Sequence, residues 1–295
     1  AMPETIDEWE TVLTAFKEKK GAQVPYSATG TGNFAYAFNT TADYYVEDGK
    51  VKHGVLDPSF KDYLTTMNRW YQNGLIDPSF ATLDQKTVEA NIMNGLSGST
   101  TGSIGSGIGK WMAAAPSSAY SLEGAPFLSP EKGQKPKFGT YQLPVTSSLT
   151  AFDAISTSCK NVDAALKFLD YGYSEEGYML YNFGIEGESY EMADGYPTYT
   201  EAITKNPEGL SMTVALANYT RSYATGPFVQ DRRYMEQYAA LPQQQRAWET
   251  WSNTDAAEHC PPHLYMKDEE LTEYAQLNNA VSYTHLRAHE TRHDL

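Results

Sequence analysis

The spacing of apolar residues near the start of the chain predicts an amphipathic helix. Residues that recur every three or four positions share one helix face, and the face here consists of Ile6, Trp9, Leu13 and Phe16. Thr5 and Glu8 form a T-x-x-E capping box in front of this run. Gly21 follows it, where a helix commonly ends. The pattern therefore predicts a helix between Thr5 and Gly21.

Three further elements follow from the pattern before residue 100. Asp48-Gly49 stands between Tyr44-Tyr45-Val46 and Val51, which predicts a hairpin. Asp57-Pro58 begins a second helix that ends at Gly74. Its apolar positions are Phe60, Tyr63, Leu64, Met67 and Tyr71. A third helix is expected from Asp84 to Gly95.

The second half of the chain is expected to be mostly helical. Asn161 is placed to cap a helix. The buried side of that helix is expected to hold Ala164, Ala165, Leu166, Phe168 and Leu169. From Pro207 onward the pattern is largely helical, interrupted by prolines.

Residues 171–200 are rich in tyrosine and glutamate and contain no histidine, lysine or arginine. A tyrosine ring can lie against the apolar face of a sugar while its hydroxyl bonds the rim, and a carboxylate accepts hydroxyl donors. The block, which begins at Tyr171, therefore points to an oligosaccharide ligand. The alternative is that these tyrosines fill the core around a helix end.

The segment from Gly98 to Trp111 is rich in glycine. It lacks the phosphate-loop pattern, because Ile104 stands where glycine would be needed and Trp111 where serine or threonine would be. Glycines here would let the backbone approach a ligand closely. Trp111 is open to two interpretations, a stacking platform or a core residue.

Composition limits the functional classes. The chain has 295 residues, 41% of them hydrophobic, which fits one large or two ordinary folded domains. The formal net charge of −15 disfavours nucleic acid and anionic membrane surfaces as partners. Two cysteines, Cys159 and Cys260, neither require nor exclude an oxidising compartment.

The end of the chain carries a zinc-peptidase-like motif, HETRH at residues 289–293. Its surroundings, VSYTHLRAHET at 281–291, match the translation of a transposase sequencing adapter. Residues 281–295 are therefore expected to be a non-native tail and are excluded from fold prediction. Without them only His53, His259 and His263 remain, too few for a metal site.

An ordered series of motifs covers nearly all of residues 3–280. The series comprises P-x-T-x-D-E-W at Pro3–Trp9, D-G-K-V at Asp48–Val51, Y-x-x-G-L-I-D-P at Tyr71–Pro78, N-x-x-N-G-x-x-G at Asn91–Gly98 and N-F-G-I-E-G-x-S-Y at Asn182–Tyr190. Together these resemble the extracellular solute-binding proteins of ABC importers, in the maltodextrin-binding-like lipoprotein branch of Gram-positive bacteria.

The resemblance implies an α/β, periplasmic-binding-protein-like two-lobe fold (type II), with an incomplete first lobe and a helix-rich C-terminal part. Residues 1–148 would form mostly the second lobe. Residues 149–190 would cross between the lobes and enter the first, and 191–280 would form a helical return region lining the cleft. The chain would then be a fragment whose leading residues, signal and lipid-modified cysteine are missing.

The same resemblance implies cleft residues. Asn33 and Phe34 correspond to a cleft loop, and the segment 103–111, with Ser106 and Trp111, to a loop that supplies a tryptophan. Glu186 and Tyr190 lie in the turn where this branch lines its cleft. Arg232 and Arg233 could contact an acidic sugar or pair with surface carboxylates.

The implied function is capture of an extracellular oligosaccharide, or another small solute, by a non-enzymatic monomer without a cofactor. A lipid anchor would hold it at the outer face of the cytoplasmic membrane, where it delivers the solute to ABC permease subunits. The rival hypotheses are a glycoside hydrolase using Glu186 and Glu188, a zinc peptidase through HETRH, and a structural surface lipoprotein. Residues two apart point to opposite faces of a strand, which argues against the carboxylate pair.

Overall fold

The computed structural model describes residues 2–114, 117, 120–139, 153–220, 228–261, 267, 269–277 and 279. Contacts divide the chain into two units, Ala1–Pro261 and Pro262–Leu295. Residues 140–152, which include the first part of the expected lobe crossing (149–152), and the expected adapter tail (281–295) lie outside the described residues. The predicted lobe boundaries at 148 and 190 remain predictions.

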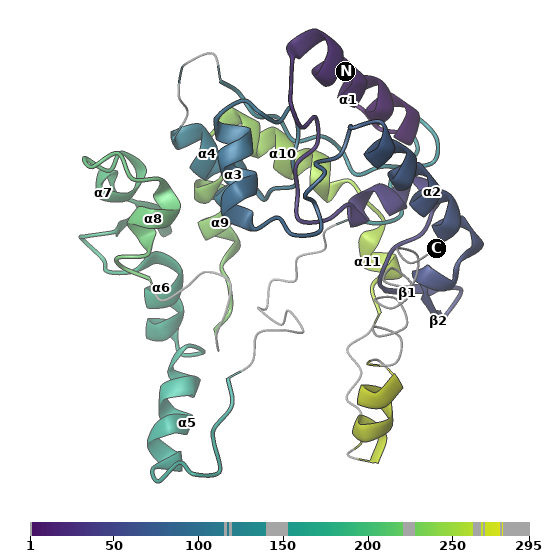
Figure 1. Ribbon diagram of the computed structural model, residues 1–295. Coiled ribbons are helices and arrows are strands. Elements are labelled where there is room, and N and C mark those ends of the chain that lie inside the picture. Colours follow the sequence, from purple (N-terminus) through teal and green to yellow (C-terminus); the bar gives the residue numbers. More distant parts are fainter. Residues whose placement is uncertain are drawn as a thin grey trace. The chain divides into compact units, whose positions relative to one another are not determined.

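The first part of unit 1 contains the three helices and the hairpin that the hydrophobic pattern predicts, with further short helical elements between and after them (Figure 1). In chain order they are α1 (Ile6–Lys20), η1 (Gly32–Phe38), β1 (Tyr44–Glu47), β2 (Lys50–His53), η2 (Gly54–Leu56), α2 (Pro58–Gln72), α3 (Gln85–Met93), η3 (Ile104–Gly109) and α4 (Lys110–Ala113).

After the residues that are not described, unit 1 continues with helices and a second hairpin. These elements are α5 (Val162–Tyr171), α6 (Glu175–Phe183), β3 (Tyr190–Ala193), β4 (Tyr196–Tyr199), α7 (Glu201–Thr204), α8 (Met212–Leu216), α9 (Arg232–Tyr238), α10 (Pro242–Ser252) and α11 (Ala256–His259). In unit 2, residues 269–277 are helical. No described helix has the length and apolar character that crossing a membrane requires.

Local sequence signals explain the helix ends. Thr5 accepts a hydrogen bond from the Glu8 backbone N–H at the start of α1, and Gly21 ends it in the left-handed conformation. Asp84 caps α3 and Asn161 caps α5 through their side chains. The predicted starts of these three helices are confirmed.

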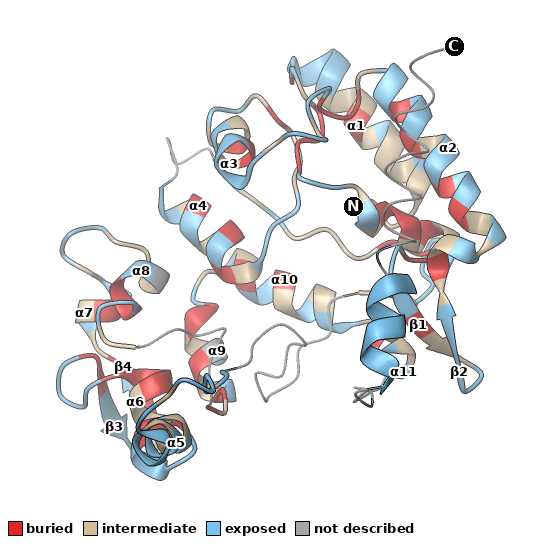
Figure 2. Cartoon of the chain, turned by 60° about the horizontal axis from the view of Figure 1, so that its bottom comes forward, coloured by how far each residue is buried: buried red, intermediate tan, exposed pale blue. Residues whose placement is uncertain are grey.

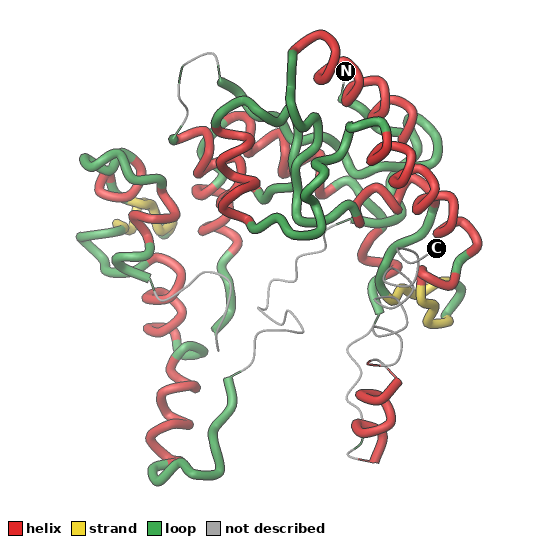
Figure 3. Tube along the Cα trace, in the orientation of Figure 1, coloured by secondary structure: helices red, strands yellow, loops and turns green. Residues whose placement is uncertain are grey.

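The described strands form two antiparallel hairpins, one β1–β2 and the other β3–β4 (Figure 3). In the first, Val46 pairs with Val51, and both Asp48 and Gly49 have positive φ. That geometry is the tight turn that Asp-Gly favours. The predicted hairpin is confirmed. Asp194 and Gly195, between β3 and β4, also have positive φ and make the same kind of turn.

Two hydrophobic cores lie within unit 1. The first joins α1, η1 and α2, and it centres on the fully buried Leu13, Trp70 and Ala35. The second joins α6, the β3–β4 hairpin, α7, α8 and α9. Its buried members are Phe183, Tyr190, Tyr199, Ile203, Ala215, Leu216, Tyr234 and Tyr238. The tyrosines at positions 190 and 199 therefore supply core, as the alternative interpretation of the tyrosine-rich block holds.

The exposed side of two helices differs from expectation (Figure 2). In α2, Leu64 and Tyr71 are exposed while Trp70 is fully buried. Phe60, Tyr63 and Met67 are buried as predicted, so the prediction is wrong only for Leu64 and Tyr71. In α5 no residue is buried, and Leu166 and Phe168 are about half exposed, at 52% and 58%. The predicted burial of α5 is wrong, because the contact with α6, in which Tyr171 meets Tyr181, leaves Ala165 and Leu169 only half-buried.

Candidate functional site

The glycine-rich segment is held close to the body of unit 1 by its backbone. The Ser99 N–H donates to the Pro25 carbonyl at 3.0 Å, and the Ser27 N–H donates to the Ser99 carbonyl at 3.1 Å. Thr101 shares a 2.9 Å hydrogen bond with the Tyr26 hydroxyl. These bonds fix residues 99–101 as one wall of a cavity.

The glycines of η3 are required by close contacts within the protein. A Cβ atom on Gly105 would lie 1.9 Å from the Tyr238 hydroxyl oxygen, and one on Gly102 would lie 3.0 Å from the Trp111 ring. The prediction was that glycine lets the backbone approach a ligand. The structure shows the backbone at Gly102 and Gly105 approaching the protein's own aromatic rings, which leave no room for a side chain there. Both glycines also line the cavity, so the approach of a ligand to this backbone stays a prediction.

Helix α10 brings two tryptophans to the same cavity. Pro242 occupies its first turn, and the side chain of Gln244 accepts a hydrogen bond from the Leu241 N–H at 3.0 Å. The Gln244 amide also donates to the Ile104 carbonyl at 2.9 Å, which joins α10 to η3. Trp248 and Trp251 are three residues apart and therefore lie on one helix face.

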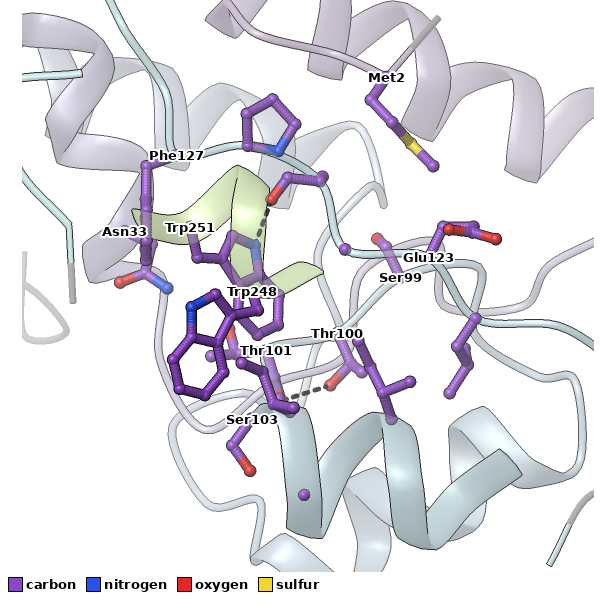
Figure 4. Close-up of a pocket in the computed structure, with 18 of the residues that line it drawn as sticks. Met2, Asn33, Ser99, Thr100, Thr101, Ser103, Glu123, Phe127, Trp248 and Trp251 are labelled. Carbon is purple, nitrogen blue, oxygen red and sulfur yellow. Dashed lines mark hydrogen bonds between the residues drawn. The ribbon is translucent and has the colours of Figure 1, made fainter. Parts of the chain in front are cut away.

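The cavity has a volume of about 1060 Å³. Figure 4 shows Trp248 and Trp251 beside Thr101 and Ser103, with Asn33 and Phe127 nearby. Its walls combine aromatic rings with small hydroxyl side chains. The lining residues with rings or polar side chains include Asn33, Ser99, Thr100, Thr101, Ser103, Ser106, Phe127, Ser252 and Thr254 as well as the two tryptophans.

Trp251 is fixed in the cavity wall by a hydrogen bond and a ring contact. The Trp251 indole N–H donates to the Ala125 carbonyl at 2.7 Å, and its ring lies 6.5 Å from that of Phe127. Trp248 is also half-buried and lines the cavity. A partly exposed indole at a cavity wall is suited to stack on the apolar face of a ligand.

Five of the sequence-predicted site residues line this cavity: Asn33, Phe34, Ser106, Trp111 and Arg232. Phe34 and Trp111 are almost fully buried, each with 3% of its surface exposed. Phe34 packs edge to face against Trp9, Tyr26 and Trp70. For Trp111, the structure favours the core interpretation over the stacking platform.

The other three cavity residues are more open. Asn33 is half-buried on η1, and Ser106 is exposed and shares a 2.7 Å hydrogen bond with Ser103. Arg232 is exposed and pairs with Glu236 at 3.1 Å. Pairing with a carboxylate is the second of the two roles expected for this arginine.

Tyr171, Glu186 and Tyr190 do not belong to the residues that line the cavity. Tyr190 is buried against Phe183, with ring centroids 5.8 Å apart. Tyr171 contacts the ring of Tyr181. Glu186 is exposed in the turn that precedes β3. The structure therefore separates this predicted group from the cavity, because the motif around it builds the second core.

Sequence reasoning missed Trp248 and Trp251. A signal was present, since the stretch RAWETW at 246–251 places two of the chain's five tryptophans three residues apart after a proline-started helix. The hydrophobic pattern predicts only that this region is helical.

Metal and paired-carboxylate chemistry find no support in the described part of the chain. The described residues contain no cluster of histidine, cysteine, aspartate or glutamate able to hold a metal ion. HETRH at 289–293 lies outside them. Glu186 and Glu188 are both exposed in one short turn, and neither lines the cavity.

Comparison with known proteins gives one curated relative and several solved structures. Lipoprotein LipO of Bacillus subtilis is 30% identical over 251 residues, which cover 74% of this chain and 48% of that protein. The chain thus spans about half the length of this relative. No protein-family model matches the chain.

Three solved structures share the fold. The alginate-binding protein AlgQ2 matches with a TM-score of 0.67 and 22% identity, over 96% of this chain and 60% of that one. An extracellular solute-binding protein from Bifidobacterium longum subsp. infantis matches with a TM-score of 0.62 and 17% identity, over 98% and 62%. The S. pneumoniae ABC-transporter substrate-binding protein FusA, in complex with fructo-nystose, matches with 0.61 and 19%, over 93% and 58%.

These matches define the class of fold. The chain has the fold of the extracellular solute-binding proteins, whose structures are two-lobed and periplasmic-binding-protein-like. The fold class predicted from the sequence motifs is confirmed. A fold does not identify a ligand, so the ligand class is argued from the cavity.

Proposed function

We propose that the protein is the substrate-binding component of an ABC importer and that it captures an extracellular oligosaccharide. The observation that carries this proposal is the pair of half-buried rings, Trp248 and Trp251, facing a wall of serine and threonine hydroxyls in one cavity. A sugar presents an apolar ring face and a polar rim, and this cavity offers a partner to both.

The names of similar solved structures support an oligosaccharide as the ligand class. One similar structure is titled an alginate-binding protein, a second holds fructo-nystose, and a third is titled as binding human milk oligosaccharides. A cavity of about 1060 Å³ has room for more than one sugar residue.

Capture and release need no catalytic group. Binding proteins of this fold act by binding a solute in one conformation, and a permease that reads this conformation uses ATP hydrolysed elsewhere. The proposal therefore assigns no reaction to the protein. The delivery partner is an ABC permease, and the binding protein acts as a monomer.

The proposed location is the outer face of the cytoplasmic membrane. The curated relative is a lipoprotein, which supports a lipid anchor on the complete protein. A tethered binding protein keeps the captured solute close to its permease, because the tether raises its effective concentration there.

A glycan array followed by calorimetry on the purified chain tests this proposal. We expect binding of at least one oligosaccharide, and no new reducing ends after prolonged incubation. Trp248→Ala should lose the binding, while Trp70→Phe, which changes the core outside the cavity, should keep it. Release of reducing ends, or no binding to any glycan by folded protein, would overturn the proposal.

A further inference from the structure

The charged side chains that line the cavity already have charged partners. Among its described lining residues the charged ones are Glu123, Asp231 and Arg232. Glu123 accepts hydrogen bonds from the Arg246 guanidinium at 2.5 and 3.1 Å. This two-bond contact is the geometry in which arginine and carboxylate bind each other most strongly.

The second carboxylate, Asp231, is paired at a more buried position than Glu123. Asp231 is buried, and the Arg233 guanidinium donates to its carboxylate at 2.5 to 3.1 Å. The Tyr178 hydroxyl donates to the same group at 2.5 Å. Asp231 therefore presents little negative charge to the cavity.

The one guanidinium among these lining residues is paired as well. The Nε of Arg232 lies 3.1 Å from the Glu236 carboxylate, one helical turn along α9. The described wall of the cavity thus offers indole rings, hydroxyls and an amide, and each of its three charged side chains pairs with a side chain of opposite charge.

We propose that this wall selects uncharged oligosaccharides over uronate oligomers of the same sugar and linkage. This inference rests on the proposed function and narrows its ligand class. A uronate that enters the cavity gives up hydration of its carboxylates, and that loss is offset only where a cation is free to bind them. The overall charge of −15 adds repulsion against a polyanion.

Matched ligand pairs test the inference by isothermal titration calorimetry on the full chain. One pair is β-1,4-mannohexaose and β-1,4-mannuronate hexamer, and the other is cellohexaose and its C6-oxidised uronate counterpart. Members of a pair differ only at C6. We expect the uncharged member to bind at least about tenfold more tightly.

The outcomes separate this inference from the proposed function. If a uronate binds as tightly as its uncharged partner, the inference is overturned while oligosaccharide binding stands. If no member of either pair binds, the inference is overturned for hexose oligomers, and the glycan array decides separately on the proposed function.

A variant that removes the carboxylate partner of Arg246 gives a second test. Glu123→Gln removes the carboxylate that neutralises Arg246 and so leaves a guanidinium without its partner beside position 123 of the cavity wall. We expect the ratio of uronate affinity to uncharged-hexamer affinity to rise about threefold or more. Glu249→Gln is the control, since it makes the same charge change at an exposed position of α10 that does not line the cavity. Equal effects of both variants, or none from Glu123→Gln, would contradict the inference.

Discussion

The indole N–H of Trp251 donates to the backbone carbonyl of Ala125 at 2.7 Å, across 126 positions of sequence. This bond joins α10 to the segment 121–128, and both line the cavity. Gly124 lies under the same ring, since a Cβ there would come within 3.1 Å of it. Trp251 is therefore a structural member of the cavity wall, and we expect Trp248, one turn earlier, to be the ring that contacts a ligand.

The two tryptophans should separate binding from stability. We expect Trp248→Ala to weaken oligosaccharide binding about tenfold to a hundredfold with little change in the free energy of unfolding. Trp251→Ala should lower the free energy of unfolding by about 2–3 kcal/mol, because packing and a hydrogen bond are both lost. Calorimetry and urea unfolding of each variant measure the two effects.

Trp251→Phe is the matched control for the hydrogen bond. It keeps an aromatic ring and removes the N–H donor, so about 1 kcal/mol of the loss should come from that bond. If Trp248→Ala unfolds the protein while Trp251→Ala does not, the assigned roles are reversed.

Glycine at position 105 should be indispensable for the fold of η3. Gly105→Ala would place a methyl group 1.9 Å from the Tyr238 hydroxyl oxygen and 2.0 Å from its ring. We expect destabilisation of about 2 kcal/mol or more, because a buried ring has no room to move aside. Thermal unfolding of the purified variant measures the loss.

Gly30→Ala provides the comparison. A Cβ at position 30 meets nothing within 4 Å, and Gly30 is absent from the glycines with positive φ. Its melting temperature should stay within the error of the unchanged chain, or rise slightly through lower entropy of the unfolded state. Equal losses in the two variants would mean that backbone freedom, and not crowding by Tyr238, explains glycine at 105.

Local signals allowed much of the fold to be predicted, but contacts between distant segments decided the site. Thr5 and Asn161 marked helix starts, and Asp48-Gly49 marked a hairpin, because caps and tight turns depend on neighbouring residues. Asp194-Gly195 carried the same signal for the second hairpin.

The role of each aromatic ring could not be read from spacing. Trp111 and Trp248 both line the cavity, yet Trp111 is almost fully buried against glycines while Trp248 is half-buried. The difference comes from which distant segment covers each ring. Leu166 shows that spacing alone also does not decide burial. Helical spacing predicts that it is buried, yet 52% of its surface is exposed.

Adjacent arginines on α9 should differ sharply in their effect on stability. Arg233 donates to the buried Asp231 carboxylate, whereas Arg232 has 84% of its side chain exposed. Burial raises the pKa of Asp231, but hydrogen bonds from Arg233 and Tyr178 outweigh it and hold the pKa below its usual value. Arg233→Ala should cost about 2–3 kcal/mol, because the carboxylate stays buried without its cation.

Arg232→Ala serves as the paired control. Its ion pair with Glu236 is exposed, and such pairs contribute only about 0–0.5 kcal/mol. Urea unfolding at pH 7 compares the two variants. Similar losses from both would show that helix propensity in α9, and not the Asp231 contact, sets the cost.

Glu47 should make stability depend on pH in the acid range. Hydrogen bonds from Lys137 and then Lys52 lower the pKa of this carboxyl from its ordinary 4.5 to about 2. Lys137 also lies over the rings of Tyr45 and Phe138, so the contact joins β1 to the segment before residue 140. A carboxylate whose pKa is lower in the folded state stabilises the fold above its unfolded pKa.

That contribution should be present in full above about pH 5 and should disappear as the pH falls from about 4.5 to about 2. Allowing for solvent screening of this partly exposed pair, we expect about 1 kcal/mol. Glu47→Gln should remove this part of the pH dependence while Asp62→Asn, an exposed change on α2, leaves it intact. Urea unfolding measured from pH 2.5 to pH 6 compares the three chains. An unchanged slope in Glu47→Gln would assign the acid sensitivity to other carboxylates, with Asp231 the next to test because its pKa is also lowered.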